Sequence, residues 1–257
     1  SKSNAFNNLS RYQQTLPSFN DDIQGTGAVV LAGIIGAVKS KGETLGQQNY
    51  LVYGAGAGGV GVADQICAGM IREGLDPQAA RARIYILDTQ GLVCDNREGL
   101  DEYKRRYAKP GLLLAQWDLQ GKAGLTEVLR HVPISVLLGT SGAGGAFQEE
   151  HIQLMLAHCE RPMVFPLSNP TANCEALPED IFRWSQGRAI VATGSPFKDV
   201  EFEGQRYRVG QGNNVFIFPG VGLAAIVSQI REISPDIFTT AAFALAAATF
   251  FLSLVPA

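Results

Sequence analysis

The stretch between Tyr50 and Gly74 constrains the fold more than any other part of the chain. The apolar run YLVY leads into the glycine-rich sequence GAGAGG, and a helical pattern, VGVADQICAGMIREG, follows it. Gly54, Gly56 and Gly59 have the spacing G-x-G-x-x-G, in which the first glycine permits a tight turn, the second lets a pyrophosphate approach the backbone, and the third lets helix and strand pack closely. A turn formed for packing alone is the alternative. Strand, turn and helix in this order predict a dinucleotide-binding turn.

Six short apolar runs alternate with helical stretches along the chain. They cover residues 50–56, 83–88, 134–140, 163–169, 189–194 and 214–220. Such runs are typical of strands buried on both faces, and their alternation with helices indicates a parallel sheet. We therefore expect an α/β fold: a Rossmann-type doubly wound, mainly parallel sheet with helices on both faces. Residues 1–24 are expected to lead into this domain, and residues 25–257 to form it.

Asp88 ends the second run, the next one after the glycine turn. Ligands of open parallel sheets bind outside the carboxyl ends of the strands, where a carboxylate accepts hydrogen bonds from the adenosine ribose of NAD. The same carboxylate would repel the 2′-phosphate of NADP. Lys104, Arg105 and Arg106 follow and leave NADP as the alternative, although such a cluster is more typical of a solvated helix face. The sequence favours NAD.

Composition excludes some classes of function. The chain has 21 basic and 24 acidic residues, so no broad attraction to nucleic acid or to an anionic membrane is expected. The four cysteines are scattered, with no spacing typical of zinc ligands, and fit a reduced, cytoplasmic setting. Residues 237–257 carry no charge and approach the length of a membrane span. Since Ser234, Pro235 and Asp236 form a helix start, we expect a buried or interface helix there.

Two adjacent carboxylates, Asp21 and Asp22, precede a helix of small residues. Taken alone, such a pair is more often a cap or a turn than a catalytic site. However, FNDDIQGT, YGAGAGGVGVAD, LLGTSGAGGAF, LSNPTANCEA, ATGSPF and GQGNNVFIFPGVGLA occur together in this order. Together they closely resemble the malic enzymes and the related malolactic enzymes, over nearly the whole chain.

The resemblance implies oxidation of L-malate by NAD or NADP, then metal-assisted loss of CO2 and protonation of enolpyruvate to pyruvate. It implies that Asp22 is a ligand of Mg²⁺ or Mn²⁺, and that Asp21 is a catalytic aspartate supporting the general base. The residues that it matches to cofactor contacts, besides the three glycines and Asp88, are Thr26, Ser141, Asn169 and Asn214. Those that it matches to substrate contacts are Asn169, Asn213 and Asn214. A homo-oligomer is also implied.

In the family, a Glu-Asp pair that completes the metal site and a domain with a tyrosine acid and a lysine base lie upstream of the position of Ser1. None of these is in this sequence, so we expect the chain to bind a dinucleotide but to be essentially inactive by itself. Malolactic activity, which converts L-malate to L-lactate and CO2 with bound NAD, is the close alternative. A noncatalytic dinucleotide sensor is a third, although it would not need Asp21, Asp22, Asn169 and Asn214.

Overall fold

The computed structural model describes residues 2–119 and 121–253, which form two compact units. Unit 1 combines three stretches of chain: the described residues up to Gly46, Gly56–Leu75, and those from Gly212 onward. Unit 2 combines Gln47–Ala55 with the described part of Asp76–Gln211. The glycine-rich turn lies where the chain passes from one unit to the other, between Ala55 and Gly56.

Unit 2 is built on a seven-stranded, mostly parallel sheet with the order β3-β2-β1-β4-β5-β6-β9. Only β3 is antiparallel to its neighbour β2 among the seven strands. The strands are β1 (Tyr50–Tyr53), β2 (Ile84–Asp88), β3 (Gly91–Leu92), β4 (Val136–Gly139), β5 (Met163–Pro166), β6 (Ile190–Thr193) and β9 (Gly210–Gln211). This strand order confirms the expected Rossmann-like α/β class.

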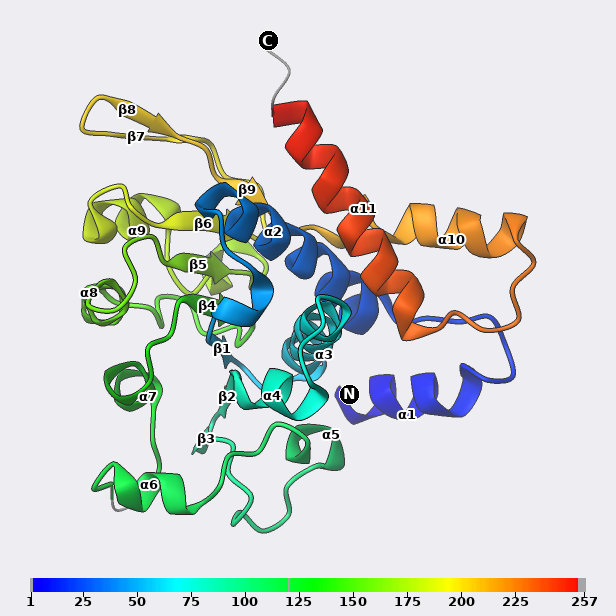
Figure 1. Ribbon diagram of the computed structural model, residues 1–257, viewed down its shortest axis with the longest axis horizontal. Helices are drawn as coiled ribbons and strands as arrows, with labels where there is room; N and C mark the ends of the chain where they lie inside the picture. Colours follow the sequence, from blue (N-terminus) through cyan, green and yellow to red (C-terminus); the bar gives the residue numbers. More distant parts are fainter. Residues whose placement is uncertain (1, 120, 254–257) are drawn as a thin grey trace. The chain divides into compact units, whose positions relative to one another are not determined.

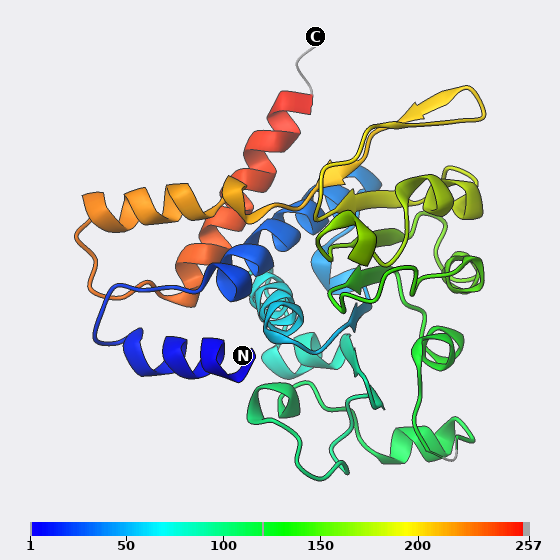
Figure 2. The same cartoon turned by 180° about the vertical axis from the view of Figure 1, so that it is seen from behind.

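Helices of unit 2 cover one face of its sheet. Leu51, Leu137 and Val164 come from three neighbouring strands and share one core cluster with residues of α7 (Leu125–His131), α8 (Glu149–Leu156) and α9 (Pro178–Ser185). Figures 1 and 2 show these three helices in a row beside the sheet. Shorter elements complete the unit: α4 (Pro77–Ala82), α5 (Glu102–Arg105), α6 (Leu112–Gln116) and the 3-10 turn η3 (Thr171–Asn173).

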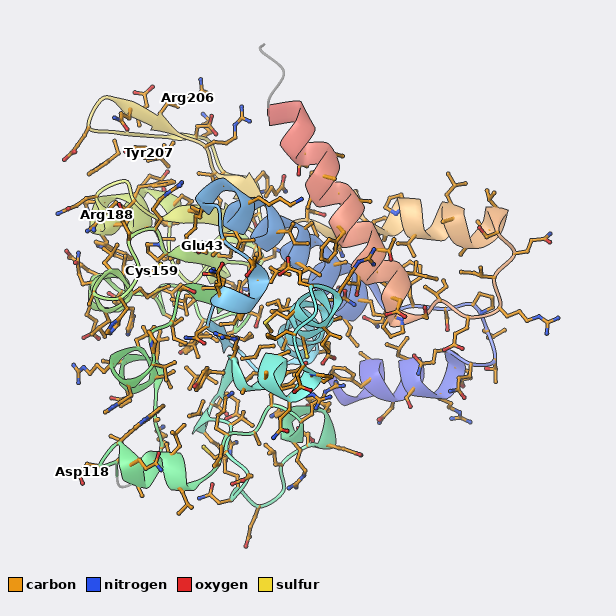
Figure 3. The ribbon with its side chains drawn as sticks, viewed as in Figure 1. Glu43, Asp118, Cys159, Arg188, Arg206 and Tyr207 are labelled. Carbon is orange, nitrogen blue, oxygen red and sulfur yellow. The ribbon has the colours of Figure 1, made fainter. Side chains whose placement is uncertain are left out.

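A two-stranded hairpin extends from the same unit. It consists of β7 (Val200–Phe202) and β8 (Gln205–Tyr207), which pair antiparallel. Tyr207, labelled in Figure 3, packs on Phe182 of α9 with ring centroids 4.8 Å apart. This contact attaches the base of the hairpin to α9.

Unit 1 is helical, with α2 (Thr26–Lys41) at its centre. The other elements are α1 (Lys2–Tyr12), the π-helical turn η1 (Asp21–Gly25), α3 (Ala57–Arg72), the 3-10 turn η4 (Asn214–Phe216), α10 (Phe218–Val227) and α11 (Pro235–Ser253). A further 3-10 turn, η2 (Leu45–Gln47), follows α2. Figure 1 shows α11 crossing α2. Glycines let α2 and α3 approach closely, since a Cβ on Gly27 would lie 2.6 Å from the carbonyl oxygen of Gly61.

The predicted C-terminal helix is present as α11, and it begins at Pro235 as expected. Phe238, Ala242 and Ala246 are fully buried, and their spacing of four residues places them on one stripe of the helix. Residues 254–257 of the predicted helix lie outside the described residues. Within the described chain, the one segment apolar and long enough to cross a membrane is Asp21–Lys41, and 72% of its apolar window is buried in the protein. It is therefore a core helix of unit 1 in this structure.

One predicted strand is wrong. Residues 214–220 form η4 and the first turn of α10 instead of a strand. The Asn213 side chain accepts a hydrogen bond from the N–H of Val215 and caps the turn, and Pro219 suits the first turn of a helix because it has no N–H to donate. The seventh strand of the sheet comes from β9, immediately upstream.

Candidate functional site

Gly54 directly follows β1 in unit 2, and no other residue type fits its position. Its φ is +122°, a conformation that side chains rarely adopt. A Cβ there would lie 2.6 Å from the carbonyl carbon and oxygen of Thr140, whose hydroxyl donates to the Gly54 carbonyl at 2.9 Å. The first glycine of the predicted turn therefore has the role that the motif requires.

The other two glycines of the motif belong to the start of α3 in unit 1. Gly56 is the N-cap residue with an extended backbone, and its helix has no side-chain cap in the described residues. Gly59 is buried in the first turn. The N–H groups at this helix start are thus left without a side-chain acceptor, which suits an anion.

Gly54, Asp88 and Ser141, predicted from separate motifs, lie at the carboxyl ends of neighbouring strands in the unit 2 sheet. Tyr53 of β1 pairs with Leu87 of β2 on one side and with Gly139 of β4 on the other. The residues that follow, Gly54, Asp88 and the Thr140–Ser141 step, therefore lie at the same level of the sheet. These are carboxyl ends of adjacent parallel strands, where the fold class binds its ligands.

Asp88 is held by donors on both carboxylate oxygens. Oδ2 accepts from Arg97 Nη2 at 2.9 Å and from Lys104 Nζ at 3.2 Å, while Oδ1 accepts from the N–H of Gln90 at 2.9 Å. Burial raises the pKa of Asp88, but the bonds from Arg97, Gln90 and Lys104 outweigh it and leave the pKa below its usual value. A carboxylate has about four acceptor positions, so one remains for a ribose hydroxyl.

The basic cluster after Asp88 differs in part from the sequence expectation. Arg105 and Arg106 are exposed, as expected of a solvated helix face, whereas the Lys104 side chain is only 17% exposed and pairs with Asp88. Arg97 was missed by sequence reasoning. It lies in a loop without a regular pattern, nine residues after Asp88, and also lines a cavity of about 230 Å³ with Gln90 and Lys122.

Ser141 and Asn169 occupy the loops after β4 and β5 in unit 2, with Ser195 in the loop after β6. Ser195 Oγ donates to Asn169 Oδ1, which joins two of these loops. Glu175, not singled out from the sequence, is fully buried and accepts from Ser141 N–H and Ser141 Oγ, both at 2.9 Å. Its position in the otherwise apolar sequence CEAL was the one available signal.

Unit 1 brings together Asp21 and Asn214, two predicted residues 193 positions apart. Asn214 Nδ2 donates to Asp21 Oδ2, while Asp21 Oδ1 is buried without a hydrogen-bond partner. Burial, followed by the charge of Asp22, raises the pKa of Asp21. Thr26, the first residue of α2, donates from its hydroxyl to the Asp21 carbonyl at 3.4 Å.

A complete metal site is not formed by the described residues. Asp22 is exposed, and no group of three His, Cys, Asp or Glu side chains with the geometry of a metal site occurs in residues 2–119 and 121–253. Asn213 is used as the cap of η4. Among these predicted residues, the candidate oxygen ligands are the exposed carboxylate of Asp22 and the partly buried carboxylate of Asp21. Two carboxylates are too few for tight binding of Mg²⁺ or Mn²⁺.

Comparison with known proteins agrees with the fold and the motifs. Residues 23–251 match the family described as malic enzyme, NAD binding domain. A NAD-dependent malic enzyme of Aeromonas salmonicida (strain A449) is 44% identical over 245 residues, which cover 95% of this chain and 43% of that protein. One from Photorhabdus laumondii is also 44% identical, over 244 residues, with the same coverage of 95% and 43%.

Solved structures show the same fold. A malic enzyme from Entamoeba histolytica superposes with a TM-score of 0.69 at 24% identity, covering 96% of this chain and 45% of that one. A malic enzyme from Pyrococcus horikoshii gives 0.68 at 26% identity, covering 95% and 51%. The chain spans 43% of the length of the Aeromonas and Photorhabdus proteins.

Proposed function

This chain belongs to the malic enzyme family, whose NAD-binding domain its residues 23–251 match, and we propose that it binds NAD as part of a longer oxidoreductase acting on L-malate. The observation that carries the proposal is the convergence of Gly54, Asp88 and Ser141 at adjacent strand ends of unit 2. Gly54, after the central strand β1, leaves room for the pyrophosphate, while the carboxylate of Asp88 beside it accepts a hydrogen bond from the adenosine ribose.

Asp88 favours NAD over NADP in this proposal. Its one remaining acceptor position suits a ribose hydroxyl, and its negative charge opposes a 2′-phosphate. Arg97 and Lys104 lie against the same carboxylate at 2.9 and 3.2 Å, so they partly offset that repulsion. NAD is therefore proposed as the preferred dinucleotide, with measurable binding of NADP.

For the whole protein we propose conversion of L-malate to pyruvate and CO2. NAD, when bound, supplies the hydride acceptor for C2 of malate. In this chain Asp21 is suited to proton transfer because its Oδ1 has no hydrogen-bond partner and its pKa is raised. The Asn214 amide holds the other oxygen of that carboxylate and keeps further capacity to contact a malate carboxylate.

A divalent cation, Mg²⁺ or Mn²⁺, is proposed for the whole protein only. Asp22 would supply one oxygen ligand, and the described residues do not provide the rest. We therefore expect the 257-residue chain to bind NAD while producing very little NADH from malate.

The test has two parts. Calorimetric titration of the 257-residue chain should detect NAD binding, and the same chain with malate, Mn²⁺ and NAD should give no NADH above background. The full-length protein under these conditions should release pyruvate and free NADH. Lactate without free NADH would instead identify a malolactic enzyme, and NAD binding without any turnover of malate would identify a sensor.

A further inference from the structure

Glu175 is a buried carboxylate in unit 2 to which the proposed function assigns no role. It follows η3, and none of its surface is exposed. Within the described residues no lysine or arginine forms an ion pair with it. A buried carboxylate without a cation is costly unless hydrogen-bond donors surround it.

The donors come from the loops that follow two neighbouring strands. Oε1 accepts from Ser141 N–H and Ser141 Oγ in the loop after β4, each at 2.9 Å, and from Ser168 Oγ after β5 at 2.6 Å. Oε2 lies 3.4 Å from the N–H of Ser168. One carboxylate therefore fixes the position of two strand-end loops.

The same two serine hydroxyls also accept hydrogen bonds from backbone N–H groups of the loop after β4. Ser141 Oγ accepts from the N–H of Ala143 at 3.0 Å, and Ser168 Oγ accepts from the N–H of Gly142 at 2.9 Å. The strand also makes room for the carboxylate, because a Cβ on Gly139 would lie only 2.5 Å from Glu175 Cδ. Both loops thus bind the Glu175 carboxylate, and the last residue of β4 packs closely against it.

The strand order indicates which part of the dinucleotide these loops would meet. Asp88, at the end of β2, lies on one side of β1, whereas β4 and β5 lie on the other side. A dinucleotide that places its adenosine ribose at Asp88 and its pyrophosphate at the end of β1 extends its nicotinamide half over β4 and β5.

We propose that Glu175 is a positioning residue for the nicotinamide half of NAD, acting by holding Ser141 and the Ser168–Asn169 turn in place. The inference rests on the proposed NAD binding. A carboxylate is needed at Glu175 and not an amide, because glutamine would keep an acceptor at Oε1 but turn its NH2 toward the N–H of Ser168. Two donors would then face each other.

The experiment compares Glu175→Gln with the wild-type 257-residue chain by calorimetric titration with NAD and with AMP. NAD should bind about tenfold more weakly to Glu175→Gln, since a charge-assisted network is replaced by a neutral one. AMP carries no nicotinamide half, so its affinity should stay within about twofold, the spread expected when no contact to a ligand changes. Ser168→Ala, which removes one donor to Glu175 and the acceptor for the N–H of Gly142, should also weaken NAD binding more than AMP binding.

Glu127→Gln is the matched control. Glu127 Oε2 accepts from the N–H of Gly124 at 2.8 Å and caps α7, so this variant makes the same chemical change in unit 2 away from the strand ends. It should leave both affinities unchanged. Equal weakening of NAD and AMP in Glu175→Gln would overturn the positioning role, as would unchanged NAD affinity.

Failure of the proposed function gives a different result. If the wild-type chain bound AMP but not NAD, or neither, NAD binding and the role of Glu175 would both be rejected. Unchanged NAD affinity in Glu175→Gln, with normal NAD binding by the wild type, would reject the role of Glu175 alone. Far-ultraviolet circular dichroism of each variant checks that a change in affinity is not loss of folding.

Discussion

Asp88 in unit 2 and Asp21 in unit 1 are both partly buried carboxylates at predicted site positions, but their neighbours differ in charge. Asp88 lies between Arg97 and Lys104, and its pKa is lowered. Asp21 has Asp22 beside it and one oxygen without a partner, and its pKa is raised by burial and by that neighbour. The surroundings of Asp88 therefore favour its charged form, whereas those of Asp21 disfavour it.

Glycine serves different purposes in the two units. In unit 2, Gly54 allows a left-handed backbone at a strand end. In unit 1, Gly61 allows close packing, because a Cβ there would lie 2.3 Å from the carbonyl oxygen of Ile23. Both glycines come from one glycine-rich stretch, so the same local sequence serves a strand-end turn in one unit and helix packing in the other.

The largest effect is expected from Gly61→Ala. The added methyl group collides with the η1 backbone at Ile23 and should lower the free energy of unfolding by about 3 kcal/mol, as overpacked cores do. Urea denaturation measures it. Gly36→Ala is the control, since a Cβ added to Gly36 in α2 would meet no atom within 4 Å, and alanine there should stabilise by up to about 1 kcal/mol. Equal stability of the two variants would contradict the packing role of Gly61.

The next effect concerns NAD affinity. Asp88→Ala removes the proposed ribose acceptor and the carboxylate that Arg97 and Lys104 share, so NAD should bind about thirtyfold more weakly. NADP binding should fall less or rise, because the negative charge that opposes the 2′-phosphate is removed while Arg97 and Lys104 remain. Calorimetric titrations with NAD and NADP give both values.

Asp76→Ala serves as the control for Asp88→Ala. Asp76 caps α4 through bonds to the N–H groups of Gln78 and Ala79, so its loss affects stability without touching the strand ends. An NAD to NADP preference that is the same in Asp88→Ala and in the wild type would show that Asp88 does not select the dinucleotide.

The smallest effect is a difference in pH dependence between Asp21→Asn and Asp88→Asn. The lowered pKa of Asp88 adds stability that is present above pH 3.8 and is lost as the pH falls through its folded value. The raised pKa of Asp21 has the opposite effect on stability. The charged form of Asp21 lowers the free energy of unfolding at neutral pH, and this loss of stability disappears as the pH falls toward 3.8.

Urea denaturation between about pH 2.5 and pH 7 tests this difference, which spans the titration range of carboxylates. At neutral pH, Asp88→Asn should destabilise the protein and Asp21→Asn should stabilise it, each by less than about 1 kcal/mol because solvent screens partly exposed charges. Changes of the same sign in both variants would remove the contrast between the two units.

Most of the sheet could be predicted because its strands are encoded locally. Five of the six apolar runs became strands β1, β2, β4, β5 and β6. The sixth, residues 214–220, failed because capping by Asn213 and the position of Pro219 favour a helix start over an extended strand, although the run is equally apolar. Short strands such as β9, with two residues, have too little pattern to be recognised.

The candidate site could be predicted only in part. Gly54 and Asp88 were predicted from the strands that they follow, and Ser141 from the family resemblance, while the parallel pairing of the strands places all three at neighbouring strand ends. Arg97 and Glu175 were not predicted, because each acts through a partner elsewhere in the chain: Glu175 is 34 residues from Ser141 and has no periodic pattern around it.

The sequence by itself determined the glycine-rich turn, the alternation of strands and helices, and the residue types at the strand ends. Each of these depends on residues close together in the chain. The tertiary structure decided that Asp88 pairs with cations and that one oxygen of Asp21 is left without a hydrogen-bond partner. The pKa of Asp88 depends on Arg97 and Lys104, and the burial of Asp21 depends on helices packed around it, so both required the folded chain.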